Sequence, residues 1–312
     1  MKTLAGETMS ILGVLFFMAA ATIPAAAQSG VTSGCANSGI YGSREIALES
    51  GGMQRSYRLY APETLPADQP VPLVLSLHGY ASDAPQQEDN SGWNVLADEY
   101  GFIAAYPQAT GAPARWFGGD LWQAAESARL VDDVAFIRAV VDDIGAQYCL
   151  DLSRVYVNGM SNGGGMSNRL ACEASDVFAA VGGVAGAYAS FGDCVPARPM
   201  PFIAFHGTDD RIVPYEGWNL MLPPIQEWAL GWAGRNGCDL TPETLPPTGE
   251  VTGIRYTGCE QDAEVVLFTA DGGGHTWPGS ESPFSFLLGR TTQDINASAE
   301  MWAFFSRHQL EG

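Results

Sequence analysis

The chain has 312 residues, of which 46% are hydrophobic and only 16% are charged, and its formal net charge is −20 at pH 7. This composition excludes an intrinsically disordered chain, because disorder requires low hydrophobicity. The length suits one large domain or two small ones, and the excess of acidic residues disfavours a nucleic-acid partner because it repels the phosphate backbone.

The first 27 residues are typical of a secretory signal peptide. An apolar run at residues 11–21 is too short to cross a bilayer. Three alanines at 25–27 match the small-x-small cleavage pattern and place Gln28 at the mature N-terminus. We therefore predict a signal peptide over residues 1–27 and a single catalytic domain over 28–312, with no membrane span in the mature chain. The expected location is secreted or periplasmic.

Short apolar runs rich in β-branched and aromatic residues alternate with helical patterns along the rest of the chain. The apolar runs lie at residues 57–60, 73–77, 102–106, 155–158, 179–184, 202–205 and 265–269. Most of them lack polar alternation, which is typical of parallel strands covered on both faces. The helical patterns lie at residues 132–148, 162–173, 225–236 and 297–308. This alternation predicts the α/β class, with a mostly parallel central sheet and helices on both faces.

The six cysteines predict three disulfides in an exported chain. Their order along the chain favours the pairs Cys172–Cys194, Cys238–Cys259 and Cys35–Cys149. A proline-rich stretch around residues 242–247 lies inside the second of these pairs and is predicted to be a stapled loop. Because no two cysteines form a C-x-x-C motif, we expect no zinc site, and we expect no other metal and no cofactor.

Residues 159–163 read Gly-Met-Ser-Asn-Gly, a G-x-S-x-G motif that lies between an apolar run and a helical pattern. In this strand–turn–helix setting the glycines permit a sharp turn, which leaves the serine exposed at the N-terminus of the helix. The helix dipole and the N–H groups there favour a developing oxyanion. Ser161 is therefore the candidate nucleophile.

A serine hydroxyl is a weak nucleophile and needs a base, and the chain has four histidines. His78 and His206 each lie between an apolar run and a glycine, which favours a role in shaping turns. His308 lies among solvent-facing residues of the last helical pattern. His275 follows three glycines in a loop after the last apolar run and comes last in the required order of serine, acid and histidine. We therefore predict that His275 is the base.

The acid of such a triad orients the imidazole and should follow a strand between the serine and the histidine. Asp209 and Asp210 both follow the apolar run at 202–205, and only one of them can face the histidine. From position alone we favour Asp210 and keep Asp209 as the alternative, with turn capping as its other role.

An oxyanion hole needs two backbone N–H groups, one of them from the residue after the nucleophile. In this chain that residue is Asn162. The second donor should come from the loop after the apolar run at 73–77, and Tyr80 is the candidate there.

The segments LHGY, VDDVAFI, GMSNGGGMSNRLACE, HGTDDRIVPY, NGC and GGGHTWPG occur in this order along the chain. In these segments the sequence resembles the exported polyhydroxybutyrate depolymerase-like esterases, which group with feruloyl and acetylxylan esterases in the α/β-hydrolase superfamily. The resemblance covers residues 43–310. It implies an α/β-hydrolase fold and hydrolysis of carboxylic esters through an acyl-enzyme, without a metal. The family motif HGT-x-D-x-x-V-P assigns the acid to Asp210.

Three tryptophans, Trp116, Trp122 and Trp277, lie in predicted loops, and Trp277 is close in sequence to His275. We expect all three to line the substrate pocket. Core packing beneath a loop is an equally open interpretation for Trp116 and Trp122.

The sequence thus predicts a secreted serine esterase whose substrate is a polyester, a short hydroxyalkanoate ester, or a feruloyl or acetyl ester of the plant cell wall. A serine peptidase of the same fold shares the triad, but no propeller or cap region precedes the catalytic part to select peptides. A non-catalytic binding protein on a hydrolase scaffold is the third interpretation, and the intact serine, aspartate and histidine argue against it.

Overall fold

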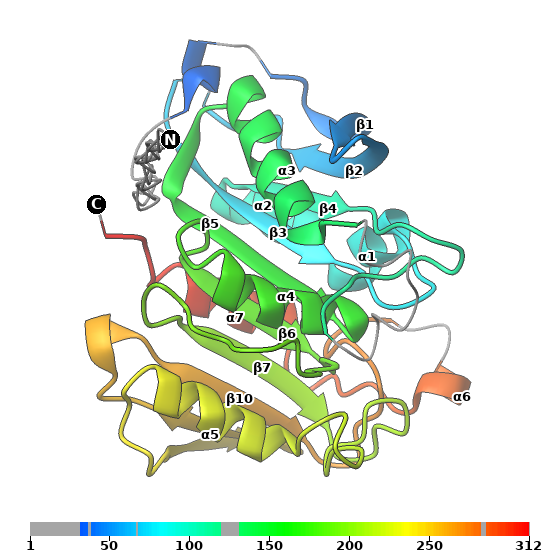
Figure 1. The fold of residues 1–312 in the computed structure, drawn as a ribbon, viewed down its shortest axis with the longest axis vertical. Coiled ribbons are helices and arrows are strands. Elements are labelled where there is room, and N and C mark those ends of the chain that lie inside the picture. The colour runs from blue at the N-terminus through cyan, green and yellow to red at the C-terminus, as the bar shows by residue number, and fades with distance from the viewer. Residues whose placement is uncertain (1–31, 37–38, 67, 120–130, 282–284, 312) are drawn as a thin grey trace, which may run out of the picture.

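A computed structural model describes residues 32–36, 39–66, 68–119, 131–281 and 285–311, so the predicted signal peptide lies outside the described residues. A ten-stranded sheet runs through the molecule in the order β1-β2-β4-β3-β5-β6-β7-β10-β9-β8 (Figure 1). The central strands are all parallel; they are β4 (Ile103–Pro107), β3 (Val71–Leu77), β5 (Leu150–Met160), β6 (Ala180–Val184), β7 (Phe202–Gly207) and β10 (Val265–Ala270). The strands at the two edges pair in antiparallel fashion. They are β1 (Gly42–Ser50) and β2 (Met53–Ala61) at one edge, and β9 (Val251–Tyr256) and β8 (Glu243–Thr248) at the other.

Helices cover both faces of this sheet (Figure 1). One face is covered by α3 (Asp133–Gln147), α4 (Asn162–Glu173) and α5 (Ile225–Arg235). The opposite face is covered by α1 (Ala84–Ser91), α2 (Trp93–Tyr100) and α7 (Ala297–Phe305). The remaining short elements are η1 (Ser33–Ala36), η4 (Glu260–Asp262) and α6 (Ser285–Leu288). The predicted α/β class, with a mostly parallel sheet between two helical layers, is confirmed.

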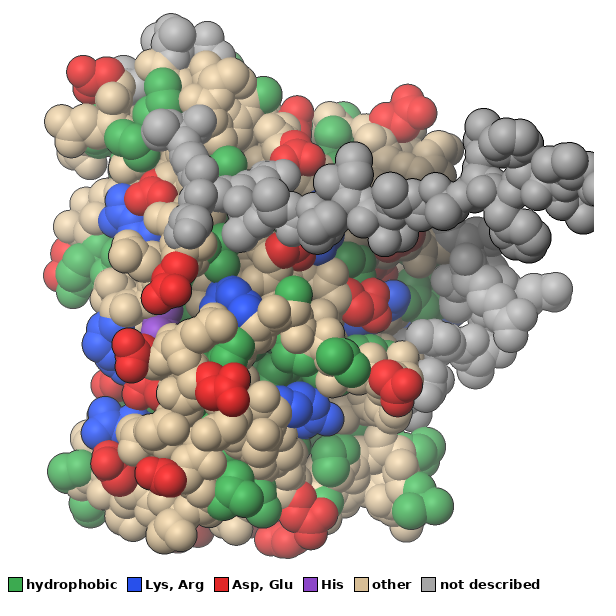
Figure 2. All heavy atoms as spheres, turned by 60° about the vertical axis from the view of Figure 1, so that its left-hand side comes forward, with side chains coloured by type: hydrophobic (Ala, Val, Ile, Leu, Met, Phe, Trp, Pro, Cys, Tyr) green, Lys and Arg blue, Asp and Glu red, His purple; other side chains and the backbone are tan. Residues whose placement is uncertain are grey.

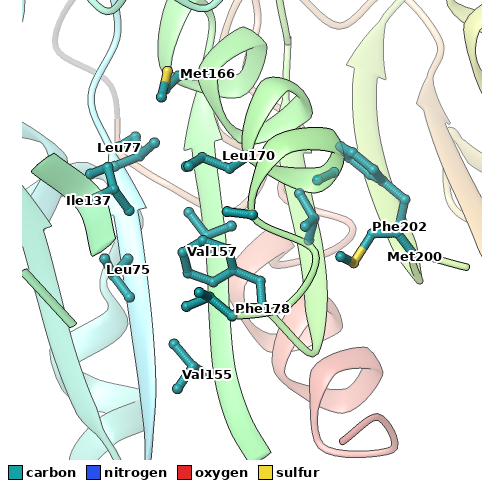
Figure 3. Close-up of a cluster of buried hydrophobic side chains, with 14 of the residues drawn as sticks. Leu75, Leu77, Ile137, Val155, Val157, Met166, Leu170, Phe178, Met200 and Phe202 are labelled. Atoms are coloured by element: carbon teal, nitrogen blue, oxygen red, sulfur yellow. The ribbon is translucent and has the colours of Figure 1, made fainter. Parts of the chain in front are cut away.

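Each face of the sheet carries its own hydrophobic core, because neighbouring residues of a strand point to opposite faces. Leu75 of β3 belongs to the core beneath α3 and α4, whereas its neighbour Val74 belongs to the core beneath α1, α2 and α7. In the first core, residues of β3 and β5 meet the apolar faces of α3 and α4 (Figure 3). Both faces of the central strands are therefore buried, which explains why these strands appear in the sequence as continuous apolar runs.

The edges of the sheet differ most from the sequence-based expectations. No apolar run or helical pattern in the sequence marked β1, β9, α1 or α2. The proline-rich stretch that was predicted to be a loop overlaps β8, so that prediction was wrong. β8 is the outermost strand, and its pairing with β9 becomes irregular between Leu245 and Thr248, where Pro246 and Pro247 lie. An edge strand tolerates prolines at such a position, because no strand on its outer side needs the backbone N–H groups that prolines lack.

Three disulfides link distant parts of the fold. The pairs are Cys35–Cys149, Cys172–Cys194 and Cys238–Cys259, which are the pairs predicted from the sequence. The first joins η1 to the end of α3, the second joins α4 to the loop after β6, and the third joins the end of α5 to the turn after β9. Disulfides of this kind persist in oxidising compartments.

The excess of acidic over basic residues in the composition is visible on the surface. On the face drawn in Figure 2, acidic side chains are spread among fewer arginines and do not gather in one patch. Of the helices in the described residues, none is both long enough and apolar enough to cross a membrane.

A partly buried acid connects the C-terminal end of the chain to the sheet. Glu264, just before β10, accepts hydrogen bonds from Arg307 Nη2 at 2.5 Å and from His308 Nε2 at 3.2 Å. Burial alone would raise the pKa of Glu264, but these hydrogen bonds and the nearby positive charges outweigh it and lower the pKa to about 2.

Replacing this acid by glutamine should therefore destabilise the protein in a pH-dependent way. Because the folded-state pKa of Glu264 is depressed, its stabilisation is complete above its ordinary pKa of 4.5 and is lost as the pH falls towards about 2. We expect Glu264→Gln to lower the free energy of unfolding by about 1 kcal/mol at pH 7, after allowance for solvent screening. Urea denaturation at several pH values measures this. A difference from wild type that does not shrink below pH 4.5 would contradict the assignment.

Candidate active site

The predicted catalytic residues follow the carboxyl ends of four central strands. Ser161 follows β5, Asp210 lies in the loop after β7, His275 lies in the loop after β10, and Tyr80 lies in the loop after β3. Because parallel strands present their carboxyl ends at one edge of the sheet, these four loops share that edge. Ser161, His275 and Tyr80 line one cavity of about 400 Å³.

Ser161 is the single residue between β5 and α4, and its backbone is strained. Its φ of 56° and ψ of −118° lie outside the regions that a side-chain-bearing residue adopts freely, at a cost of about 1–3 kcal/mol. Its N–H donates to Val184 O and its carbonyl accepts from the N–H groups of Gly165 and Ala187, at 2.9–3.0 Å. These bonds hold the turn in the conformation expected of a nucleophile elbow.

Two glycines of the motif make the turn possible by close backbone approach. A Cβ on Gly159 would lie 2.4 Å from Gly163 C and O, and one on Gly163 would lie 2.3 Å from Leu77 O and 2.5 Å from His78 O. α4 therefore begins in direct contact with the end of β3, which carries the loop of Tyr80.

Gly163→Ala should separate these two segments. The added methyl group meets backbone atoms that cannot rotate away, so we expect a loss of about 1–3 kcal/mol in unfolding free energy, the usual range for overpacking. Esterase activity should fall further than stability explains, because α4 and the loop after β3 supply the two predicted oxyanion donors. Thermal unfolding and ester hydrolysis below the melting temperature separate the two effects. Gly231→Ala in α5 is the control, because the nearest contact of its added Cβ is the far end of a flexible arginine side chain.

The structure pairs Asp210 with His275. His275 Nδ1 lies 2.7 Å from Asp210 Oδ2, and both side chains are buried. Asp210 Oδ1 accepts the backbone N–H groups of Ile212 and Val213 at 2.9 and 2.8 Å. The alternative acid, Asp209, is exposed to solvent. The geometry therefore selects Asp210 as the partner of the imidazole.

Electrostatics keep this acid ionised. Burial would raise the pKa of Asp210, but the imidazoles of His275 and His206, whose nitrogens lie 2.7 and 3.4 Å from its Oδ2, lower it well below its usual range. An ionised carboxylate accepts the Nδ1–H of His275 and so leaves Nε2 as the unprotonated nitrogen of the neutral ring. A base in this tautomer can accept the proton of a serine hydroxyl.

The segments of the predicted oxyanion hole lie beside Ser161. A Cβ on Gly79 would be 3.4 Å from Ser161 Cβ and 4.0 Å from its Oγ, so the Gly79–Tyr80 peptide adjoins the hydroxyl. Asn162 is the first residue of α4, and the N–H groups of a first helical turn have no partner within the helix. Its side chain does not enter the cavity, because Nδ2 donates to Trp116 O and Oδ1 accepts from Trp116 N.

The three predicted substrate-binding tryptophans have different positions. Trp277 lines the cavity, and its Nε1 donates to Ser298 Oγ at 3.1 Å. Trp116 does not line it, contrary to the prediction, because its ring is completely buried and its Nε1 donates to His78 O at 2.9 Å. It joins Asn162 to the loop after β3 and so supports the site from beneath. Trp122 lies outside the described residues.

Much of the cavity wall consists of residues that no sequence pattern had marked. Helix α1 contributes Gln86, Gln87 and Asn90 to it, and α6 contributes Leu287 and Leu288. α1 has little apolar periodicity, so no hydrophobic pattern marks it. Its one clear signal is at the start, where Asp83 caps the helix by accepting the N–H of Gln86 and a proline occupies the first turn.

His78 and His206 both have structural partners at strand ends. His78 is buried beside β4, and its Nε2 accepts the N–H of Ala109 at 3.0 Å while Nδ1 donates to Gly79 O at 2.8 Å. Burial lowers the pKa of His78. Within the described part of the chain, no group of three or more histidine, cysteine or acidic side chains is arranged to hold a metal ion.

Comparisons with known proteins show the family of this chain. Residues 55–202 match the family described as Esterase PHB depolymerase. The chain is 33% identical over 283 residues to the putative esterase NocK of Nocardia uniformis subsp. tsuyamanensis, which covers 82% of this chain and 79% of the relative. The chain belongs to the polyhydroxybutyrate depolymerase-like esterases. This family of carboxylic-ester hydrolases is part of the α/β-hydrolase superfamily.

Other members and neighbours of the family extend the comparison. Feruloyl esterase B of Piromyces equi is 32% identical over 226 residues, a match that covers 69% of this chain but only 41% of the relative. Among solved structures, an acetyl xylan esterase from Aspergillus awamori superimposes with a TM-score of 0.57 at 20% identity, over 75% of this chain and 94% of that one. That superposition supports the fold of this polyhydroxybutyrate depolymerase-like esterase.

Proposed function

We propose that this chain is an exported serine esterase that cleaves neutral carboxylic esters through an acyl-enzyme. One observation carries the proposal. The hydrogen bond between Asp210 and His275 ends at the cavity in which the strained Ser161 also lies. An acid, a base and a nucleophile in this order form a catalytic triad. The three disulfides and the apolar N-terminal sequence support export, with residues 1–27 as a cleaved signal peptide and 28–312 as the catalytic domain.

In the proposed reaction, Ser161 Oγ attacks the ester carbonyl carbon while His275 Nε2 takes the hydroxyl proton. The N–H groups of Tyr80 and Asn162 hold the negative oxygen of the tetrahedral intermediate. The intermediate collapses when the carbon–oxygen bond to the alcohol breaks, and His275 gives its proton to the leaving oxygen. Water then attacks the acyl group with His275 again as the base, and the carboxylic acid leaves as Ser161 recovers its proton.

The cavity lining supports a neutral ester as the substrate. Amide side chains of α1 form one part of the wall, and Met160, Trp277, Leu287 and Leu288 form an apolar part. Apart from the imidazole of His275, the charged residues of the lining, Asp89 and Glu281, are both acidic. Acidic residues at the rim repel an anionic substrate and the carboxylate product. Polyester segments, short hydroxyalkanoate esters, and feruloyl or acetyl esters of cell-wall polysaccharide all satisfy these conditions.

Two measurements test the proposal. Diethyl p-nitrophenyl phosphate should phosphorylate one serine, and peptide mapping by mass spectrometry should place the label on Ser161. A panel of polyhydroxybutyrate film, methyl ferulate, acetylated xylan and aminoacyl-anilides then defines the substrate, and we expect turnover of esters and not of anilides. Cleavage of anilides without ester turnover would show a peptidase instead, and labelling of a different serine would reject the site.

A further inference from the structure

His206 lies against the carboxylate of the proposed triad. It is the second-last residue of β7, and its side chain is 1% exposed. Its Nε2 lies 3.4 Å from Asp210 Oδ2. The same Nε2 lies 2.8 Å from the carbonyl oxygen of Val213. Sequence position had indicated only a turn residue, because nothing in the order of residues shows that β7 and the loop after it fold back on each other.

The partners of the ring fix its tautomer. A carbonyl oxygen only accepts hydrogen bonds, so Nε2 of His206 must carry the hydrogen that Val213 O receives. In a neutral imidazole Nδ1 is then unprotonated, and Nδ1 of His206 is buried without a hydrogen-bond partner among the described residues. A proton on that nitrogen would have no acceptor, so the structure suits a neutral ring that donates through Nε2 alone.

His206 and Asp210 both form hydrogen bonds with the backbone of Val213 in the loop after β7. Asp210 Oδ1 holds the N–H of Val213, whereas His206 holds its carbonyl oxygen. Oδ2 of the same carboxylate faces two imidazoles, that of His275 at 2.7 Å and that of His206 at 3.4 Å. His206 therefore contacts both the loop that carries the acid and the carboxylate oxygen that meets His275.

Among the described residues, the other groups placed against His206 are uncharged. The ring of Tyr215, from the same loop, meets it edge-on at 5.9 Å between centroids. On one side Thr269 of β10 is its register partner and holds the hydroxyl of Tyr215 at 2.8 Å. On the other side β6 pairs Val184 with Phe205, the residue before His206. Asp210 is the acid within ion-pair distance of His206.

We propose that His206 is a positioning residue of the triad, which fixes the Asp210 carboxylate and moderates the basicity of His275 through their shared oxygen. The inference rests on the proposed function. Without the polarised N–H of His206 at 3.4 Å, Asp210 Oδ2 would present more negative charge to His275, and an unneutralised opposite charge raises the pKa of an imidazole. The acid limb of the pH profile, which follows the ionisation of the base, would then move to higher pH.

Two substitutions separate this role from simple packing. His206→Phe keeps a ring against Tyr215 but removes the donor, whereas His206→Gln places an amide N–H near the position of Nε2 and does not titrate. We expect His206→Phe to lower kcat for p-nitrophenyl butyrate by about 3–10-fold, the usual effect of losing one neutral hydrogen bond that positions the acid. KM should change little, and the acid limb of kcat/KM should move upward. His206→Gln should restore most of the rate and the wild-type acid limb.

Controls make the outcome decisive. His308→Gln alters a histidine that contacts Glu264 and does not line the cavity, so its kinetics should match wild type. The downfield proton resonance of the His275–Asp210 hydrogen bond should shift in His206→Phe and persist in His206→Gln, which reports on the site without turnover. An unmoved acid limb and resonance in His206→Phe, or a His206→Gln variant as impaired as His206→Phe, would overturn the role of His206. A wild type without ester turnover would instead reject the proposed function itself.

Discussion

Ser161→Ala is expected to lower kcat for p-nitrophenyl butyrate by about 10⁴–10⁶-fold, the range seen when a triad nucleophile is removed. Alanine cannot form the acyl-enzyme, so only the oxyanion donors and the binding of substrate would remain to speed direct attack by water. KM should stay close to the wild-type value, because the cavity lining is otherwise unchanged. Steady-state kinetics at pH 7–8, after removal of trace wild-type enzyme, measure the effect.

The fold of the Ser161→Ala variant should be intact or slightly more stable. Ser161 has a φ of 56°, and its strain belongs to the turn rather than to the hydroxyl. Circular dichroism and thermal unfolding check this. Ser306→Ala, at the end of α7, is the matched control, because Ser306 does not line the cavity and should keep wild-type kinetics. Equal rates for wild type and Ser161→Ala would end the esterase assignment at this site.

Asp210→Asn is expected to lower kcat by about 10⁴-fold, although it changes the shape of the side chain very little. The backbone decides how the new amide is oriented. The N–H groups of Ile212 and Val213 both point at Oδ1, so the amide oxygen must occupy that position and the NH₂ group must take the place of Oδ2. The NH₂ group would then donate to Nδ1 of His275, leaving the proton of the neutral ring on Nε2, and a protonated Nε2 cannot accept the proton of Ser161.

Asp209→Asn provides the control for this prediction. Asp209 precedes Asp210, is exposed and contributes only its backbone N–H, which donates to Gly273 O at 2.9 Å. Its variant should keep kcat within about threefold of wild type, as expected for a surface change that leaves the triad intact. A large loss in Asp209→Asn, together with an active Asp210→Asn, would reverse the assignment of the acid.

The central part of the fold was predictable because its signals are local. Strands buried on both faces must be apolar at nearly every position, and six such runs in the sequence correspond to β3–β7 and β10. The G-x-S-x-G motif marks a turn whose shape depends on its own glycines, and α4 begins at Asn162 as the pattern indicated. The order of serine, aspartate and histidine then narrowed four histidines to one base.

Elements with one face in solvent, or with functional rather than apolar side chains, were not predictable in this way. β1 alternates between half-buried and exposed residues, and β8 contains two prolines, so neither has an apolar run. α1 supplies amide side chains to the cavity and lacks the apolar periodicity by which a helix is recognised. Trp116 was ambiguous for another reason, because a tryptophan in a loop has the same sequence context whether its ring faces a ligand or the core.

The sequence by itself indicated the class of the fold and the pairing of its cysteines, and it supplied the candidates for the nucleophile and the base. These depend on local patterns or on order along the chain. Only the tertiary structure showed the contact of Asp210 with His275, the burial of Trp116 beside Asn162, and the approach of His206 to the carboxylate of Asp210. These contacts join side chains of separate strands and loops. Their partners are set by the path of the backbone, since a loop that turns by one residue more or less presents a different side chain to the same neighbour.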